Sequence, residues 1–316
     1  MNDAEQGLPA RIVWQDDGLL VLDKPSGVPV LADRSGLPCL WNALKAWLAP
    51  QGLQPLAVHR IDKGTSGLLL VALRPDVQRA LGDAFESGTI GKWYSAISAA
   101  PLPCRGSIEI DLPIAAGRKS RWRIAGPRES IRQRHRRAWR VWFLPKPARS
   151  RDKPGRDALT HARTIRSDGE RAWLCVRPHT GRTHQIRVHL AWIGCPLLGD
   201  PLYGAPAEAW QQAPRLALHC HRLVLPEGLA GTPPYASTAA STAGTTPGTT
   251  TGKTTGKTER KTEGKTREST AGSADPPTQE TGAADLHLQS ETGVRQRPRV
   301  FTAPLPAGFL ALIPDA

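Results

Sequence analysis

Cysteine, methionine and long apolar runs are scarce in this chain of 316 residues. Its five cysteines are widely spaced and form no Cys-x-x-Cys pair, which argues against a disulfide framework and a thiolate zinc site. The longest apolar runs, such as SGLLLVAL (66–73), are far too short to cross a bilayer. No basic region followed by an apolar stretch opens the chain, so no secretory signal is visible. We therefore expect reduced thiols, no membrane association and a cytoplasmic location.

Residues 236–285 contain no aliphatic residue larger than alanine, no aromatic residue, no methionine and no cysteine. A segment of this kind cannot bury enough apolar surface to offset its ordering entropy. Its GKT triplets lack the glycine that a phosphate-binding loop needs five positions before the second glycine. The composition predicts a disordered, low-complexity insertion over about 229–298.

The remaining chain alternates strand and helix patterns without a regular strand–helix–strand rhythm. Turn residues separate predicted strands near 11–15 and 19–24, and further strands are expected at 91–97, 171–178 and near Phe301. Helical spacing occurs at 37–48, 75–85 and 183–194, with Asp76 and Thr183 as expected N-caps. These patterns predict an α+β fold with a mixed, mostly antiparallel sheet and flanking helices. We expect one catalytic domain over 10–228, completed by a strand and loop at 299–316.

The net charge of +14 and the pI of about 10.1 favour a polyanionic partner. Residues 118–156 hold fifteen lysines and arginines against two acids, and three tryptophans are interspersed among them. Arginine beside planar aromatic rings suits phosphate pairing and base stacking. We interpret this stretch as a basic insertion that binds nucleic acid; a solvated loop without a partner is the alternative. The tryptophans are Trp122, Trp139 and Trp142.

Asp62 is the first candidate for chemistry, because HRIDKGTSG places it directly before an apolar run. A carboxylate at the edge of a buried strand needs a partner. The downstream segment HTGRTHQIRVHL offers arginines, and one aimed at Asp62 would stabilise the charged form that a nucleophile or base requires. An ordinary turn is the alternative for Asp62 alone. The histidine spacing gives no convincing metal site, so we expect no metal and no cofactor.

Five segments in order resemble the RluA-type pseudouridine synthases. They are VLDKPSGVPV, HRIDKGTSGLLLVA, GKWYSAI, HTGRTHQIRVHLAWIGCPLLGDPLYG and LALHCHRLVL, and FTAPLP resembles the family's ending. The resemblance spans about residues 12–225. It implies the pseudouridine synthase fold and the isomerisation of uridine in RNA without cofactor or metal. Ile61 stands where the family usually has leucine. No S4-type module is expected before Arg11, and the chain is closest to the branch without S4 that acts on ribosomal or transfer RNA.

The same resemblance implies roles for seven residues. Asp62 would be the catalytic carboxylate, as nucleophile at ribose C1′ or base at C2′, and Arg187 would pair with it. Tyr94 would stack on the flipped base and is also a candidate general base. The remaining expected contacts to substrate are Arg60, Ile186, Arg182 and His184.

Two other functions remain open from the sequence. One is a non-catalytic RNA-binding or assembly protein on the same fold, which an intact and paired Asp62 would disfavour. The other is a retaining glycosidase, which needs a second carboxylate about 5–5.5 Å from the first. Asp23 and Asp200 are the acids that could supply it. The partner is expected to be ribosomal or transfer RNA, the chain is expected to be a monomer, and the particular uridine is not indicated.

Overall fold

The computed structural model describes residues 8–33, 36–104, 106–118, 121–136, 139–149, 155–204, 213–229 and 298–314. The chain divides into two units, and all of these residues belong to the unit formed by Met1–Pro233 with Val294–Ala316. The predicted insertion at 229–298 lies outside the described residues except at its two ends, so its disorder stays a prediction.

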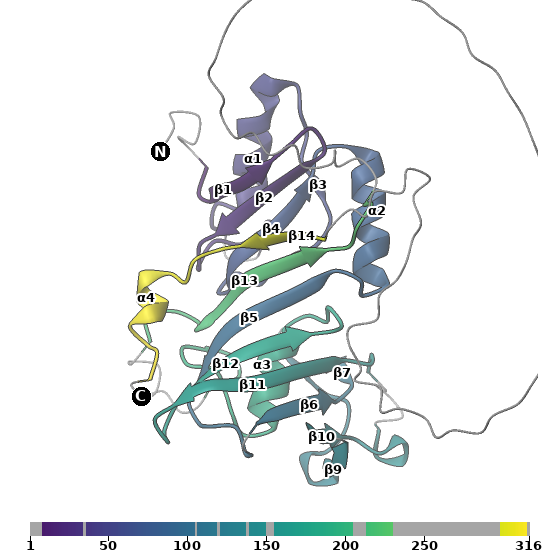
Figure 1. Cartoon of the computed structure of the whole chain (residues 1–316), viewed down its shortest axis with the longest axis vertical. Helices are drawn as coiled ribbons and strands as arrows, with labels where there is room; N and C mark the ends of the chain where they lie inside the picture. The colour runs from purple at the N-terminus through teal and green to yellow at the C-terminus, as the bar shows by residue number, and fades with distance from the viewer. Residues whose placement is uncertain are drawn as a thin grey trace, which may run out of the picture. The chain divides into compact units, whose positions relative to one another are not determined.

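A mixed, mostly antiparallel sheet of twelve strands forms the framework of this unit (Figure 1). Two pairings, β4 with β13 and β6 with β10, are parallel, and the other named pairs of this sheet are antiparallel. The predicted fold class is therefore confirmed. The strands run in the order β1 (Arg11–Gln15), β2 (Leu19–Lys24), β4 (Ser66–Ala72), β13 (Leu218–Leu225), β5 (Gly91–Ser98), β12 (Ala172–Pro178), β11 (Leu159–Ser167), β6 (Ser107–Asp111), β10 (Trp139–Phe143) and β9 (Arg132–Arg136). Two more strands join at β4 and β13, namely β3 (Leu56–Ala57) and β14 (Arg299–Thr302).

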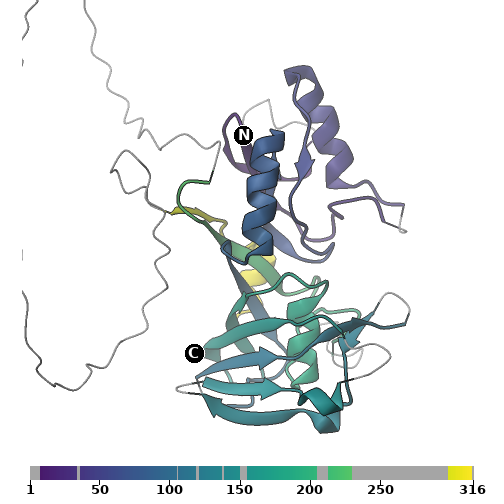
Figure 2. The same cartoon turned by 90° about the vertical axis from the view of Figure 1, so that its right-hand side faces the viewer.

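Strand β4 is buried along its whole length because a helix covers each of its faces. Leu68 and Leu70 pack with Leu81 of α2 (Pro75–Glu86), whereas Leu69 and Val71 pack on the side of α1 (Leu40–Leu48). Alternate residues of a strand point to opposite faces, so a strand covered on both sides is apolar at every position. The run SGLLLVA thus anchors the loop that carries Asp62. Figure 2 shows the two helices on either side of these strands.

Helix α3 (Gln185–Trp192) covers one face of the second half of the sheet. Its Val188 and Leu190 share a core with Leu174 and Val176 of β12. The expected N-caps are wrong: His184, not Thr183, precedes α3, and Arg74, not Asp76, precedes α2. Pro75 takes the first helical position of α2 and moves Asp76 into the first turn, where its charge still favours the helix dipole.

Gly67 permits the close approach of β13 to β4. Its φ is +105°, which disfavours other residues, and an added Cβ would lie 2.3 Å from the Cys220 carbonyl oxygen. At this point β13 pairs with β4, and farther along the same edge β13 pairs with β14. The final strand predicted around Phe301 is therefore present as β14.

The described part of the basic stretch is ordered into strands rather than a solvated loop. β9 and β10 pair antiparallel and extend the sheet beyond β6, while β7 (Ile114–Ala116) and β8 (Trp122–Ile124) form a separate pair. Trp142 is 3% exposed and belongs to the core, so its expected role in base stacking is wrong. Three 3₁₀ turns and a C-terminal helix complete the elements: η2 (Ala49–Gln51), η3 (Arg128–Ser130), η4 (Lys146–Ala148) and α4 (Ala307–Leu310).

Candidate active site

A cleft of about 630 Å³ lies between the Asp62 loop, α2 and the start of α3. All seven residues that the sequence indicated line it, although they come from three separate segments of the chain. Acidic, basic and aromatic side chains therefore meet in one concave site. The seven are Arg60, Asp62, Tyr94, Arg182, His184, Ile186 and Arg187.

The Asp62 loop is held by the turn that follows β2. Lys24 is fully buried, and its Nζ donates to the carbonyl oxygens of Pro25 (2.7 Å), Val28 (2.8 Å) and Lys63 (3.2 Å). Ser26 donates to the carbonyl of Gly64 at 2.6 Å. Burial lowers the pKa of Lys24 to about 7, and the nearby carboxylate of Asp62 partly offsets that shift. The KPSG turn therefore fixes the backbone on which Asp62 stands.

Arg187 joins two carboxylates. Its Nε and Nη2 donate to Asp200 at 2.8 and 2.7 Å, and its Nη1 donates to Oδ2 of Asp62 at 3.1 Å. The side chains of Arg187 and Asp200 are 5% and 0% exposed, whereas that of Asp62 is 17% exposed. Burial lowers the pKa of Arg187, but the bonds to Asp200 and the charges of both carboxylates outweigh it and raise the pKa above its usual range. The inner pair thus presents a fixed N–H to Asp62.

Asp62 keeps one oxygen for chemistry. Oδ2 accepts the bond from Arg187, and no described residue donates a hydrogen bond to Oδ1. A carboxylate that is oriented through one oxygen and open at the other can act as nucleophile or base.

His184 completes a hydrogen-bonded chain beside Asp62. Its Nδ1 lies 2.8 Å from the hydroxyl of Tyr203, which also accepts the backbone N–H of Trp122 at 2.7 Å. The other ring nitrogen, Nε2, lies 3.8 Å from Oδ2 of Asp62. Burial lowers the pKa of His184, with Asp62 opposing the shift. Its left-handed φ of 57° is a strained conformation of the kind found at functional sites.

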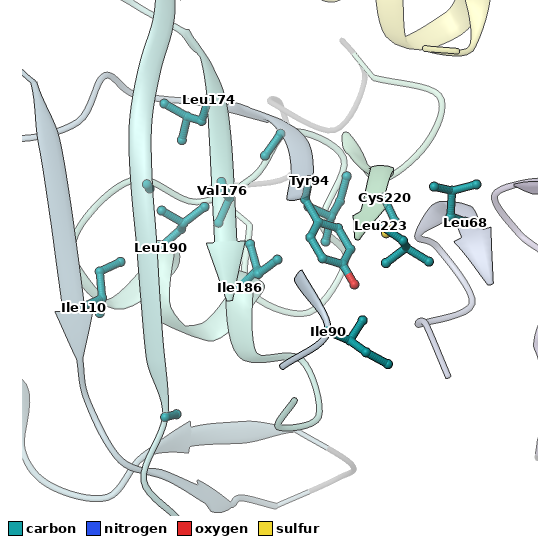
Figure 3. Close-up of a cluster of buried hydrophobic side chains, with 14 of the residues drawn as sticks. Leu68, Ile90, Tyr94, Ile110, Leu174, Val176, Ile186, Leu190, Cys220 and Leu223 are labelled. Atoms are coloured by element: carbon teal, nitrogen blue, oxygen red, sulfur yellow. The ribbon is translucent and has the colours of Figure 1, made fainter. Parts of the chain in front are cut away.

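Tyr94 lies at the floor of the cleft within a mainly apolar cluster (Figure 3). In that view its ring lies between the side of Ile186 and the side of Cys220. Burial, followed by interaction with Cys220 and Asp62, raises the pKa of Tyr94 well above its usual range. The phenol is therefore protonated at neutral pH, which suits stacking and hydrogen bonding better than proton abstraction.

The loop before α3 is fixed by Gln185. Its Oε1 accepts from Thr180 Oγ1 (2.7 Å) and from the backbone N–H of Arg182 (3.0 Å), and its Nε2 donates to Leu159 and Thr160. Arg182 itself donates through Nε to the carbonyl of Asp157 at 3.0 Å. These bonds place a guanidinium at the cleft wall, and the exposed Arg60 also lines the cleft.

Sequence reasoning missed three residues that organise the site. Lys24, Asp200 and Tyr203 orient the Asp62 loop, Arg187 and His184 respectively. All three occur in the segments that carried the resemblance, KPSG and GDPLYG, and a buried lysine or aspartate within such a segment is the signal that could have found them. Asp200 was considered only as a glycosidase carboxylate.

Neither acid that the sequence offered as a second glycosidase carboxylate lines the cleft. Asp200 is fully buried behind Arg187 and Asp23 pairs with Arg11 at 3.4 Å. Over the described ranges, no group of three or more His, Cys, Asp or Glu side chains could hold a metal ion. In the same part of the chain, no helix is long and apolar enough to cross a membrane.

The fold and the cleft together define an enzyme site built around a single oriented carboxylate. The family described as RNA pseudouridylate synthase matches residues 18–192 of this chain. An uncharacterized RNA pseudouridine synthase of Zymomonas mobilis is 34% identical over 218 residues, which cover 68% of this chain and 87% of that protein. Ribosomal large subunit pseudouridine synthase D of Nitrosomonas europaea is 36% identical over 230 residues, covering 70% of this chain but only 59% of the relative.

Solved structures agree with the sequence comparisons. Human RNA Pseudouridylate Synthase Domain Containing 4 matches with a TM-score of 0.53 and 27% identity, over 68% of this chain and 84% of the human chain. Human RNA Pseudouridylate Synthase Domain Containing 1, at 21% identity and a TM-score of 0.53, supports the fold. The chain belongs to the RNA pseudouridine synthase family, whose enzymes are isomerases, and it is of the RluA type.

Proposed function

We propose that this protein converts particular uridines of RNA to pseudouridine, with Asp62 as the catalytic carboxylate. The observation that carries the proposal is the bond from Arg187 to Oδ2 of Asp62 at 3.1 Å, at the wall of a cleft that can hold a nucleotide. The bond orients the carboxylate, and Oδ1 stays open to the substrate. The same pairing argues against a purely RNA-binding protein, because binding alone needs no oriented acid.

Asp62 acts on the ribose of the uridine, either by attacking C1′ or by removing the proton on C2′. The bond from C1′ to N1 breaks, the uracil turns within the cleft, and C5 bonds to C1′ as the Asp62 carboxylate leaves C1′; on the other route Asp62 returns the proton to C2′. The proton on C5 is then lost and N1 regains one, so the atoms balance without any co-reactant. Because the detached uracil must stay in place while it turns, a closed and partly apolar site is required.

The uridine must leave its base stack to reach Asp62. Tyr94 and Ile186 form the apolar surface against which the uracil packs, and the neutral Tyr94 hydroxyl stays a donor. Arg60, Arg182 and His184 surround the opening and contact the ribose and phosphate of the flipped nucleotide. Phosphate contacts of this kind offset the free energy of unstacking.

Ribosomal RNA is the first substrate to test, and transfer RNA the second. Several similar proteins bear the name ribosomal large subunit pseudouridine synthase D, which favours an rRNA uridine. We further propose that 10–228 and 299–316 form one catalytic domain, that the protein acts as a cytoplasmic monomer, and that it uses neither metal nor cofactor.

The test is pseudouridine mapping by carbodiimide-blocked primer extension in cells that lack the protein. At least one rRNA or tRNA position is expected to lose its signal. Wild-type protein should restore that position, whereas Asp62→Ala should not. If no RNA position changes, or if Asp62→Ala restores the signal, the proposed function is wrong.

A further inference from the structure

Strands β11 and β12 have a second face that the cleft does not use. Leu174 and Val176 of β12 point into the core beneath α3, so Cys175 and Arg177 point to the opposite side. C-terminal residues near Phe309 cover that side around Ile97 and Trp173. Toward the cleft end of the strands, no described helix covers it (Figure 2).

Six exposed arginines lie on this open face, and we call it the arginine face. They come from four strands, and only three of them belong to the basic stretch of 118–156. Two acids, Glu109 and Asp111, lie among them; Arg136 and His161 contact Glu109 at 3.6 and 3.1 Å. The six are Arg132, Arg134, Arg136, Arg163, Arg177 and Arg222.

Strand register places the centre of the arginine face in one row across the sheet. Arg222 of β13 is opposite Trp93 of β5, and both Arg222 and Arg177 hold their guanidinium groups over the Trp93 ring, at 5.1 and 4.8 Å. Arg177 is in turn opposite His161 of β11. Guanidinium planes and indole rings stacked in this way form flat surfaces for unpaired bases.

The row continues to the edge of the sheet. His161 is opposite Glu109, which is opposite Val141 of β10, and Val141 is opposite Arg134 of β9. The guanidinium of Arg134 lies 4.7 Å from the ring of Phe143, and the Trp139 ring lies 4.4 Å from that of His161. Six steps between strands make the row about 29 Å long, enough for several nucleotides of a single strand.

A pair of histidines connects the arginine face to the cleft. His179 lines the cleft, and its Nε2 lies 3.0 Å from Nδ1 of His161 in the row. An RNA strand that enters the cleft can therefore pass around the end of β12 onto the arginine face. Arginines on β9 could merely protect a sheet edge from pairing, but Arg163, Arg177 and Arg222 stand on inner strands where no edge exists.

We infer that the arginine face binds the single-stranded RNA that flanks the target uridine. Its arginines pair with phosphates, and bases stack on Trp139 and on the guanidinium-flanked Trp93. The inference rests on the proposed action on RNA and extends it to a second surface. Most of the affinity then lies outside the cleft, while the reaction stays within it.

The test measures binding of a uridine-rich, single-stranded RNA by the full chain. In Arg134→Gln/Arg177→Gln/Arg222→Gln, Kd is expected to rise at least about tenfold, and the slope of log affinity against log salt to become shallower by about 2, because three phosphate contacts are lost. Lysine at the same three positions keeps the charge and should recover most of the affinity.

A matched control removes three exposed cations elsewhere, in Arg11→Gln/Lys45→Gln/Arg79→Gln. Its Kd should stay within about twofold of wild type, because these residues lie outside the arginine face. Equal weakening by both triple variants, or unchanged affinity in the arginine-face variant, would overturn the inference. Photo-cross-linking of the bound RNA should mark peptides containing Trp93 or Trp139, and cross-links confined to other peptides would contradict it.

Binding needs no turnover, which separates this inference from the proposed function. Asp62→Ala should bind the RNA as wild type does. An inactive protein that still loses affinity in the arginine-face variant would refute only the proposed function. A protein that modifies RNA but binds it equally well without the three arginines would refute only the second surface.

Discussion

The two faces of the sheet at strands β11 and β12 differ in burial and charge. On the cleft side, buried polar side chains are held by specific partners, as in the Arg187 bridge between Asp62 and Asp200. On the arginine face, long cationic side chains extend into solvent around a few aromatic rings. Chemistry depends on position to a fraction of an ångström, whereas phosphate binding depends on charge summed over many contacts. Substitutions should therefore act on turnover on one face and on affinity on the other.

The largest effect is expected from Asp62→Asn. The variant keeps the shape of the side chain but loses its nucleophilic or basic oxygen, so the rate of pseudouridine formation should fall by about 10⁴ or more. Single-turnover assays at saturating RNA measure the rate, and a binding assay should give an unchanged Kd. A fall in rate of less than tenfold would place the essential carboxylate elsewhere.

Asp200→Asn tests whether the buried partner of Arg187 positions Asp62. Loss of the bidentate pair lets the guanidinium shift, and a displacement near 1 Å is expected to slow turnover about 10²-fold. Breaking a buried ion pair should also lower the free energy of unfolding by about 3 kcal/mol. Asp23→Asn, whose partner Arg11 is exposed, is the control and should change stability by less than about 1 kcal/mol. Equal effects of both variants on turnover would remove the positioning role.

Tyr94 separates stacking from proton transfer. Its raised pKa keeps the phenol neutral, so Tyr94→Phe should slow turnover by about tenfold at most, while Tyr94→Ala should slow it far more. Both kcat and KM should be measured on one RNA. If Tyr94→Phe is as inactive as Asp62→Asn, the hydroxyl takes part in the chemistry.

Lowering the pH should reduce the free energy of unfolding, because the core contains buried neutral histidines. Burial lowers the pKa of His189 and of His219 to about 4, so each is neutral in the folded state. Their contribution is fully present above the unfolded pKa of about 6.5 and is lost as pH falls toward 4. Between pH 6.5 and pH 5 each should cost about 2 kcal/mol. Urea unfolding at the two pH values measures the loss.

One substitution at a buried histidine and one at an exposed histidine test the source of this pH dependence. His189→Gln should reduce the dependence of the unfolding free energy on pH by close to one proton. His135→Gln, on the exposed strand β9, is the surface control. If the two variants behave alike, the buried histidines are not its source.

The smallest effect is expected from deletion of residues 236–285. The sequence predicts that this segment contributes no core, and β13 pairs with β14 on either side of it in the chain. Activity on a bare RNA and the unfolding midpoint should stay close to those of the full chain. A deletion variant that fails to fold would show that the segment is structural.

Sequence patterns predicted much of the framework because they report local physics. Alternation and turns located β1, β2, β5 and β12, and the uninterrupted apolar run after Asp62 indicated a buried strand. The helix caps failed because Pro75 and the strained His184 changed the first turns of α2 and α3. The predicted stacking role of Trp142 was wrong because spacing alone does not show which face of a basic strand is buried.

By itself the sequence determined the family, the α+β class and the set of seven cleft residues, since ordered motifs identify chemistry without coordinates. Only the tertiary structure decided that Asp200 anchors Arg187, that Lys24 clamps the Asp62 loop, and that three arginines from inner strands join the β9 arginines. These relations join residues far apart in the chain. Register between strands and packing in the core create them, and neither is written in any local stretch of sequence.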